Sequence, residues 1–511
     1  MKLCANDAKQ ESRPTLIQAT STNIPGQARP SYLRQNWPGL LALLAVVLAT
    51  RAVWFGDPVA DYDEQLYSFI GWRLQYGELP FVDWWDRKPF GLFAIFGIAH
   101  LLFGPGPIAF QLVAALSAFA SGWLTYANAR LIGGRLAATF AGAVTVILLS
   151  TYGSYSGQSE VFFTPLLLAM VRLLAESDHR AFTRRAALAM LLGGIALQVK
   201  YTVIPHCVMF GLYALWIEYR RGADLGALVR RALLFAALGL LPTVLVALLY
   251  LAAGGFDAFF FANFVSFFDR LPAQQGRWKS GYRILVAPVA IFMMGGAYAA
   301  FRMSPPRDWA VWRLFALFGV ASVFSVFLPS TVYGYYFAGF AGPAALLAVP
   351  LFDSRSVLRI AISLALVAFL AYLLNQPARY ERSQRDRRET DRFAAAIAPH
   401  VDAKGKCLWL FDGPTSLYRM TGSCVPTRFV YPDHLNNALE TKALGVDQTG
   451  EVARVLATRP TVIVTANRPV TQQNLQANAL VNAAIAADYR AIANADIQKR
   501  TLTAWVLKIG E

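Results

Sequence analysis

The sequence predicts a polytopic α-helical membrane protein with a small α/β domain at its C-terminal end. Hydrophobic residues make up 56% of the 511 residues, whereas charged residues make up only 15%. The hydrophobic residues form blocks that approach the roughly 20 residues needed to cross a bilayer. After about residue 375 the composition changes to a charged run and then to alternating strand and helix patterns, which are typical of a soluble α/β domain.

Three regions follow from this pattern: a disordered tail over 1–36, a transmembrane domain over 37–375 and an α/β domain over 376–511. The tail is polar and shows no cleavable signal peptide. A further apolar block covers about 90–104. About eleven spans are expected near 38–55, 108–129, 136–152, 160–176, 186–200, 203–219, 232–252, 281–301, 310–328, 335–352 and 357–374.

Basic residues cluster in alternate loops, and the positive-inside rule places those loops in the cytoplasm together with the tail. The orientation of the chain in the membrane therefore explains the formal charge of +16, and no nucleic-acid partner is expected. The C-terminal domain and the first long loop, 56–107, are then extracytoplasmic. Block 90–104 must not cross the membrane, because a crossing would turn all the later clusters outward. The clustered residues are Arg130, Arg135, Arg180, Arg184, Arg185, Arg220, Arg221, Arg230, Arg231, Arg302, Arg307, Arg313, Arg355 and Arg359.

The first outer loop is predicted to hold two helices that lie at the membrane interface. In 64–74 apolar residues recur at helical spacing opposite Glu64, Gln65 and Ser68, a pattern that fits a helix in the headgroup plane. Block 90–104 is the second. The loop begins with Asp61, Asp63 and Glu64 and carries Asp86, Arg87 and Lys88 midway. Carboxylates near a basic pair at a membrane surface indicate a site that handles both a proton and a phosphate.

Other unusual residues are expected on the same side of the membrane. Glu160 opens a span, Lys200 ends one, and Arg270 follows a run of phenylalanines. Lysine and arginine complement a phosphate, although Lys200 is also explained by snorkelling to the headgroups. Tyr333 and Tyr336 lie in a short outer loop, where an aromatic belt is as good an explanation as ligand binding.

The first outer loop resembles the signature of C-type, lipid-sugar-dependent glycosyltransferases. This family includes protein O-mannosyltransferases, lipid A aminoarabinose transferases and galacturonosyltransferases of lipopolysaccharide. The resemblance covers about 38–350 and implies a polyprenyl-phosphate sugar donor, inversion, and transfer to an acceptor on the extracytoplasmic face. The matching residues are Asp63-Glu64-Gln65-Leu66-Tyr67, Gly77, Lys88-Pro89 and Leu102-Phe103-Gly104, with a second segment from Gly193-Gly194 to Lys200-Tyr201.

The resemblance also implies roles for single residues. Asp63 matches the catalytic acid of the first loop, with Glu64 beside it, and Glu160 falls near a second acidic position. Lys88 and Lys200 match basic positions near the donor phosphate, and Phe90 departs from the proline that many relatives have there. With the residues derived above, the expected catalytic set is Asp63, Glu64 and Glu160, and the expected substrate-binding set is Asp61, Arg87, Lys88, Lys200, Arg270, Tyr333 and Tyr336.

The C-terminal domain shows no phosphate-binding loop and no metal-ligand spacing, so no cofactor is expected and a divalent metal is not indicated. It either binds the acceptor or forms a structural cap. Cys407 and Cys424 can pair if the domain faces an oxidising space. Strands are expected over 406–412, 427–431, 461–466 and 502–509, and helices over 452–457 and 473–487.

The leading hypothesis is a glycosyltransferase of the bacterial inner membrane, with the N-terminus in the cytoplasm and the C-terminal domain in the periplasm. Its partners are the polyprenyl-phosphate sugar, an extracytoplasmic acceptor and membrane lipid. A transporter or lipid-linked-sugar flippase is the alternative, and it predicts ionisable residues near the bilayer midplane. A non-catalytic scaffold is a third hypothesis.

Overall fold

The computed structural model describes residues 32–176, 180–272, 282–329, 331–352, 356–374 and 376–508. These residues belong to two units, Met1–Pro38 and Gly39–Glu511. Most of the predicted tail lies outside the described residues, but a helix already begins at Tyr32, within the stretch predicted to be disordered. The bundle and the C-terminal sheet both belong to the second unit.

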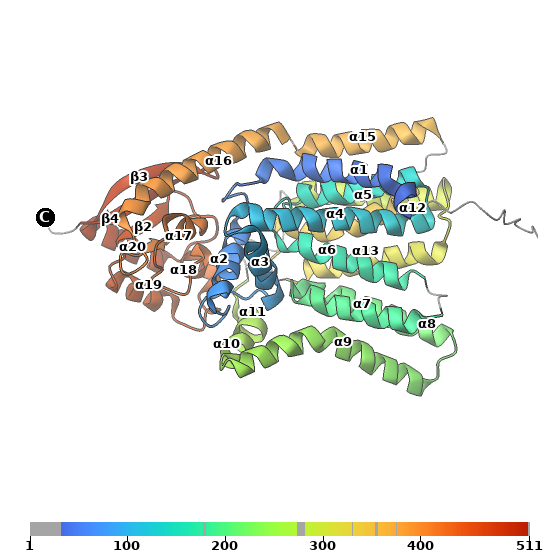
Figure 1. Cartoon of the computed structure of the whole chain (residues 1–511), viewed down its shortest axis with the longest axis horizontal. Helices are drawn as coiled ribbons and strands as arrows, with labels where there is room; N and C mark the ends of the chain where they lie inside the picture. Colours follow the sequence, from blue (N-terminus) through green and yellow to red (C-terminus); the bar gives the residue numbers. More distant parts are fainter. Residues whose placement is uncertain are drawn as a thin grey trace, which may run out of the picture. The chain divides into compact units, whose positions relative to one another are not determined.

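The N-terminal part of this unit is helical. The bundle helices run roughly side by side (Figure 1). α4 packs against α5 and α6, and α7 packs against α6 and α9. The long helices are α1 (Tyr32–Arg51), α4 (Pro107–Ile132), α5 (Arg135–Thr151), α6 (Ser159–Leu174), α7 (Phe182–Leu197), α8 (Ile204–Arg220), α9 (Leu225–Ala252), α12 (Tyr282–Arg302), α13 (Trp309–Phe327) and α15 (Val357–Leu374).

Six stretches within the described ranges are long and apolar enough to cross a membrane. Five lie in α1, α4, α9, α12 and α13, and the sixth begins with α15. α5–α8 are 16 or 17 residues long, and predicted span 335–352 is built from a 3-10 helix, Gly334–Phe340, followed by the short α14 (Ala341–Leu347). The multi-pass membrane architecture therefore holds, whereas the number of eleven spans is not established.

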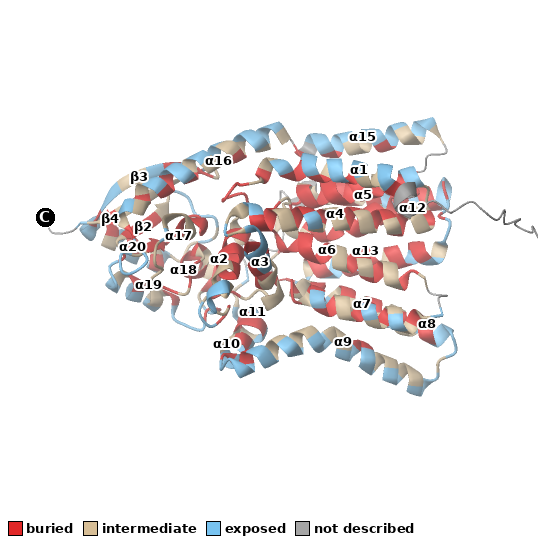
Figure 2. Ribbon diagram, in the orientation of Figure 1, coloured by how far each residue is buried: buried red, intermediate tan, exposed pale blue. Residues whose placement is uncertain are grey.

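The burial of side chains differs sharply between helices (Figure 2). α5 and α6 are mostly buried and form the core of the bundle. Only 6% of the most apolar window of α9 is buried. Exposed apolar side chains are unfavourable in water and favourable in lipid. The exposed surface of α9 therefore fits contact with the hydrocarbon part of a membrane.

Both predicted helices of the first loop are present, at the end of the bundle that faces the C-terminal sheet (Figure 1). They are α2 (Tyr62–Arg73) and α3 (Phe90–Phe103), which pack against each other. The prediction that α2 lies on a surface with its polar side exposed is wrong. Glu64, Gln65 and Ser68 are all buried, because Gly157, Ser416 and His100 provide them with hydrogen-bond partners.

Short helices connect the bundle to the C-terminal part of the chain. α10 (Phe256–Phe260) and α11 (Ser266–Asp269) flank a π-helical turn, Phe261–Val265, after α9. α16 (Gln376–Ile397) is the charged run predicted after the last span, and it packs against strand β3 (Tyr489–Ile497).

The C-terminal part contains a four-stranded mixed sheet with the order β1-β2-β4-β3. β1 and β2 are parallel, and β4 is antiparallel to both of its neighbours. The remaining strands are β1 (Leu408–Leu410), β2 (Val462–Ala466) and β4 (Arg500–Leu507), and the helices around them are α17 (Ser416–Thr421), α18 (Pro432–Asn436), α19 (Gln448–Ala457) and α20 (Leu475–Asp488).

Three of the four predicted strands coincide with β1, β2 and β4, and both predicted helices are present. Predicted strand 427–431 is wrong, because this segment is an extended loop whose Arg428 carbonyl accepts the N–H of Trp85 at 3.0 Å. The missing strand is β3. It joins β4 through Gln498 and Lys499, which both adopt positive φ angles, 51° and 65°, as a two-residue hairpin turn requires.

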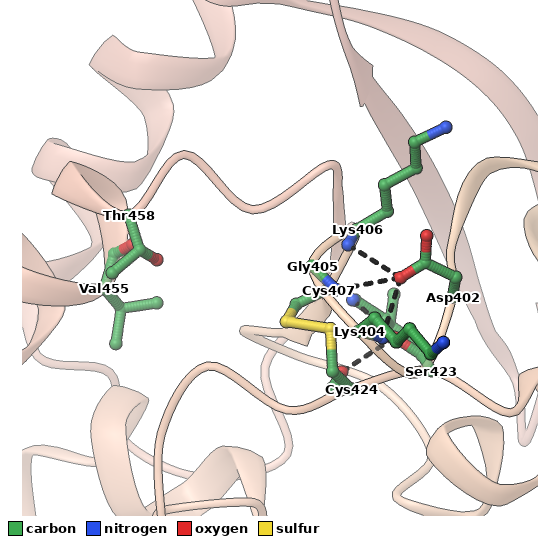
Figure 3. Close-up of a disulfide and its surroundings, with 10 residues drawn as sticks. Asp402, Lys404, Gly405, Lys406, Cys407, Ser423, Cys424, Val455 and Thr458 are labelled. Atoms are coloured by element: carbon green, nitrogen blue, oxygen red, sulfur yellow. Dashed lines mark hydrogen bonds between the residues drawn. A yellow bond between two sulfur atoms is a disulfide. The ribbon is translucent and has the colours of Figure 1, made fainter.

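A disulfide joins Cys407 and Cys424, whose Cα atoms are 4.7 Å apart (Figure 3). It closes a segment that begins just before β1. Beside it, a carboxylate oxygen of Asp402 accepts the backbone N–H groups of Lys404 and Gly405 at 2.8 Å and of Lys406 at 3.0 Å. The N–H of Cys424 also donates to the carbonyl of Asp402 at 2.8 Å. This hydrogen bond joins the turn at 402–406 to the disulfide.

Candidate active site

The three acids at the start of the first loop have different local roles. Asp61 is the N-cap of α2 and accepts the N–H of Asp63 at 3.0 Å, while Glu64 accepts the N–H of Asp61 at 3.3 Å. This is a capping box, which satisfies two backbone donors that the first helical turn leaves unpaired. The sequence Asp61-Tyr62-Asp63-Glu64 therefore first of all starts a helix.

Glu64 points away from the site that Asp63 faces. Its side chain is fully buried, and its second oxygen accepts the N–H of Gly157 at 2.6 Å. Burial, followed by the charge of Asp61, raises the pKa of Glu64 well above its ordinary value. The expected catalytic role of Glu64 does not agree with this position, since it lies outside the cavity described below.

Asp63 is held from two sides. One oxygen accepts the Tyr431 hydroxyl at 3.1 Å, and the other accepts the Gln158 amide at 3.2 Å. Burial alone would raise the pKa of Asp63, but the charge of Lys88 and these two hydrogen bonds outweigh it and lower the pKa. Burial and the charge of Asp63 raise the pKa of neighbouring Asp61 to about 7. One ionised carboxylate and one that titrates near neutrality thus lie side by side.

Two lysines approach this pair from other elements. Lys88 lies just before α3, with its ammonium 5.3 Å from the centre of the Tyr67 ring. Lys200 follows α7 and is almost fully buried, 4.2 Å from the ring centre of Tyr336. Aromatic faces of this kind stabilise an ammonium at partly dry sites.

Lys200 also forms an ion pair with Glu160 at the first turn of α6. Burial lowers the pKa of Lys200, and the charge of Glu160 opposes this effect. Glu160 does not line the cavity, so its expected role as a second catalytic acid does not fit its position. It holds Lys200 in place, and because the lysine is buried in this pair, snorkelling to the headgroups does not explain it.

The two arginines of the predicted set meet at one carboxylate from the C-terminal part. Arg270 donates to Glu440 at 2.7 Å and to the Tyr333 hydroxyl at 3.0 Å, and Arg87 forms an ion pair with the same Glu440. Burial opposes ionisation of Glu440, but Arg87 and Arg270 lower its pKa to about 2. Two cations and one anion leave a net positive charge on this side of the site.

These residues surround a cavity of about 380 Å³. The helical part contributes the first loop, Gln158, the segment after α7, the residues around Arg270 and the tyrosines before α14. The C-terminal part contributes residues from the segments 431–440 and 470–471. Of the predicted site residues, the cavity contains Asp61, Asp63, Arg87, Lys88, Lys200, Arg270, Tyr333 and Tyr336.

Sequence reasoning missed the contributions of the C-terminal part. Tyr431, Asp433, His434 and Glu440 all line the cavity, and Arg500 fastens the sheet to α2 by donating to the Tyr62 hydroxyl at 2.5 Å. They form no motif and lie far from the first loop in sequence. Gln158 was also missed, whereas Asp86, which lies in the cavity as well, had been noted beside Arg87 and Lys88 without being given a role.

Within the described ranges, the acidic, histidine and cysteine side chains form no group of three placed to hold a metal ion. The described side chains of the cavity place an ionised carboxylate next to cations in a partly dry site. Such a site can accept a proton and stabilise a developing negative charge.

The fold is shared with proteins of known structure. No family model and no curated protein matches the sequence. The crystal structure of ArnT from Cupriavidus metallidurans bound to undecaprenyl phosphate is similar with a TM-score of 0.61 and 15% identity, covering 93% of this chain and 98% of that chain. Its apo structure gives a TM-score of 0.60 with 15% identity over 92% and 98% of the two chains.

A more distant likeness is to the apo oligosaccharyltransferase of Archaeoglobus fulgidus, with a TM-score of 0.53 and 11% identity over 85% of this chain and 70% of that chain. At these identities the comparisons establish the fold. The chain therefore shares the fold of these proteins.

Proposed function

We propose that this protein is a glycosyltransferase that moves a sugar from a polyprenyl-phosphate carrier to an extracytoplasmic acceptor with inversion at the anomeric carbon. One observation carries the proposal: a single cavity places the carboxylate of Asp63 beside Lys88 and Lys200. The shared fold supports it, since ArnT has been crystallised with undecaprenyl phosphate.

The reaction is a single displacement. The acceptor oxygen forms a bond to the anomeric carbon while the bond from that carbon to the phosphate oxygen breaks. The acceptor proton passes to Asp63, which is ionised and therefore able to accept it. The electron pair of the broken bond stays on the polyprenyl phosphate, whose negative charge grows as it leaves.

The cations act on that growing charge. Lys88 and Lys200 face the same cavity as Asp63, and a charge developing between them is stabilised more than in bulk water. Arg87 and Arg270 share Glu440, so they contribute a smaller net charge and also position the C-terminal residues. Tyr333 and Tyr336 supply walls against which a sugar or prenyl group can pack.

The proposal places the protein in a bacterial inner membrane with the cavity and the C-terminal sheet in the periplasm. The arginine clusters of alternate loops support this orientation. The Cys407–Cys424 disulfide supports it as well, because such bonds persist in oxidising compartments.

The transporter alternative fits less well. Asp61 and Asp63 begin α2, Lys88 precedes α3, and Lys200 follows α7. The cavity thus gathers its charges at helix ends, whereas a transport pathway needs them near the middle of the bilayer.

The test compares envelope glycolipids and glycans by mass spectrometry in cells with and without the protein, and then follows sugar transfer from the identified polyprenyl phosphate in liposomes. Asp63→Asn should lower the rate by roughly 10²–10⁴-fold, as expected for loss of a general base. Asp61→Asn should lose less, because asparagine also caps helices. Asp83→Asn, in the same loop but outside the cavity, is the matched control and should behave like the wild type. Near-normal transfer by folded Asp63→Asn would contradict the assignment.

A further inference from the structure

A second cavity lies where α15 gives way to α16. Its volume is about 590 Å³. Its lining is mostly cationic, with Arg379, Arg382, Arg385 and Lys499 beside Glu381, Leu374 and Ala378. It has no lining residue in common with the cavity that contains Asp63.

The position of this cavity coincides with a change of surface. α15 is apolar, and its side chains Phe369 and Tyr372 are exposed. α16 begins at Gln376 and is rich in arginine and glutamate. An apolar helix surface followed at once by a charged one marks the boundary between hydrocarbon and water, and the cavity lies at that boundary.

Two of the arginines are held on aromatic side chains of the bundle. The Arg379 guanidinium lies 5.5 Å from the ring centre of Tyr155 and donates to the carbonyl of Ser150 at 3.3 Å. Arg382 lies 5.3 Å from the ring centre of Trp54. Stacking fixes the plane of a guanidinium and leaves N–H groups at its edge for an anion, so these arginines are oriented in advance.

The charges of the cavity are not balanced by its own residues. Three arginines, one lysine and one glutamate line the cavity, and Arg385 also pairs with Asp386 at 3.2 Å, so the cations outnumber the anions by two. The spacing of Arg379, Arg382 and Arg385 puts them on one side of α16, and the hairpin turn of β3 and β4 brings Lys499 to the same place. Like charges gathered this closely are stabilised by a bound anion.

We propose that this cavity binds the phosphate of a membrane lipid in the leaflet next to the C-terminal sheet. The phosphate contacts the arginines and Lys499, and the acyl chains lie along the exposed apolar surfaces of α15 and α1. The cavity fits a lipid better than a free anion, because Leu374 and the α15 surface add apolar contact that inorganic phosphate cannot use. Binding at this site is independent of the transfer reaction proposed above, so either proposal can fail alone.

The test measures binding to the full-length purified protein in detergent by native mass spectrometry. The probes are dioctanoylphosphatidylglycerol, dioctanoylphosphatidylcholine and inorganic phosphate. The double variant Arg385→Gln/Lys499→Gln removes two of the four lining cations and leaves Arg379 and Arg382 on their aromatic side chains in place. Arg388→Gln, on the same helix but outside the cavity, is the matched control.

The anionic lipid should bind the wild type at least tenfold more tightly than either other probe, the double variant should lose about tenfold in affinity, and Arg388→Gln should lose none. That tenfold corresponds to the loss of one charge-assisted hydrogen bond. Equal binding of the anionic lipid to wild type and a folded double variant overturns the proposal. Binding of inorganic phosphate as tight as that of the lipid overturns the assignment to a lipid.

Discussion

Asp61 and Asp63 are two residues apart on one helical turn, and yet their pKa values move in opposite directions. Asp63 receives hydrogen bonds from Tyr431 and Gln158 and lies near Lys88, which together outweigh its burial. Burial raises the pKa of Asp61, and the charge of Asp63 raises it further, because Asp61 receives only backbone N–H groups of its own helix and a long hydrogen bond from Gln158 at 3.5 Å. Where environments push two acids apart in this way, the acid with the lowered pKa is the one that carries the charge at neutral pH.

Tyr431 is the positioning residue that this arrangement depends on. Tyr431→Phe removes the hydroxyl that donates to Asp63 at 3.1 Å, so the pKa of Asp63 should rise. We expect the rate of sugar transfer to fall by about tenfold, the usual scale of a hydrogen bond to a charged group, and the acid limb of its pH profile to move to higher pH. Both are measured with the liposome assay.

The pH profile separates positioning from mere packing, since a structural role would lower the rate at every pH alike. Tyr489→Phe, in the sheet with its hydroxyl on the Pro460 carbonyl, is the control and should keep the wild-type profile. A variant at Tyr431 with an unshifted acid limb would show that this hydroxyl does not set the state of Asp63.

The effect of Asp433 on the stability of the folded protein can be tested without a substrate. Burial raises the pKa of Asp433 to about 7 from an ordinary value of 3.8, although its hydrogen bond from Thr471 opposes this. Between these pH values the folded protein holds a proton that the unfolded chain has lost, so stability falls as the pH rises through about 7.

Asp433→Asn cannot lose this proton, so the variant should gain stability relative to wild type as the pH rises from 5 to 8. The expected gain at pH 8 is about 1–2 kcal/mol, which is discounted from the full shift because the side chain faces a water-accessible cavity. It is measured as the difference in melting temperature at the two pH values. Asp488 is exposed, so Asp488→Asn should show no pH-dependent gain in stability. If Asp433→Asn shows no such gain either, the argument from burial is contradicted.

At the scale of elements, helices were predicted more reliably than the surfaces they pack on. Apolar spacing revealed α2 and α3, but the polar side of α2 was expected in water and is buried. Its partners, Gly157, Ser416 and His100, belong to three different segments. A sequence pattern reports that polar and apolar residues lie on opposite sides of a helix; it does not report that another segment satisfies the polar side.

Strand β3 is an element that the sequence pattern did not predict. Its sequence, YRAIANADI, contains three alanines and three polar residues, so neither β-propensity nor alternation predicts a strand. It is a strand because it pairs with β4, which has a strong pattern, and because α16 packs against it. Tertiary context decides such an element, as it also turned predicted strand 427–431 into the loop that delivers Tyr431.

The Cys407–Cys424 disulfide should be important to the C-terminal sheet because it closes a loop with a sequence separation of 17 residues. Replacing both cysteines with alanine is expected to lower the free energy of unfolding of this part by about 3 kcal/mol. Urea denaturation followed by the fluorescence of Trp409 and Trp505 measures it. A reducing agent should destabilise the wild type and leave the double variant unchanged, and identical unfolding curves for oxidised wild type and variant would contradict the prediction.

For the whole molecule, orientation in the membrane is the property on which the proposed function depends. Single cysteines at Arg180, Arg230 and Lys404 are all in exposed positions, and they can be placed in a chain whose Cys4 and Cys207 are replaced by serine. A membrane-impermeant maleimide should label position 404 in cells with a permeable outer membrane and should label 180 and 230 only after lysis. Labelling of 180 and 404 from the same side would invert the proposed topology.

The sequence located one wall of the cavity and not the other. Asp63, Lys88 and Lys200 were expected because acids and cations near the ends of apolar segments are costly and conspicuous. Tyr431, Asp433 and Glu440 belong to a soluble pattern in which tyrosines, aspartates and glutamates are ordinary. Only folding gives them a distinct environment, because it places them opposite the first loop.

Tyr431 and Asp63 are separated by 368 positions along the chain. A ribosome therefore completes the carboxylate and nearly every apolar helix long before it reaches the tyrosine. Chains in this stage of synthesis have only the first of the two walls of the cavity, and the second wall forms when the C-terminal segment has folded. A chain whose synthesis stops before Tyr431 therefore cannot complete the site.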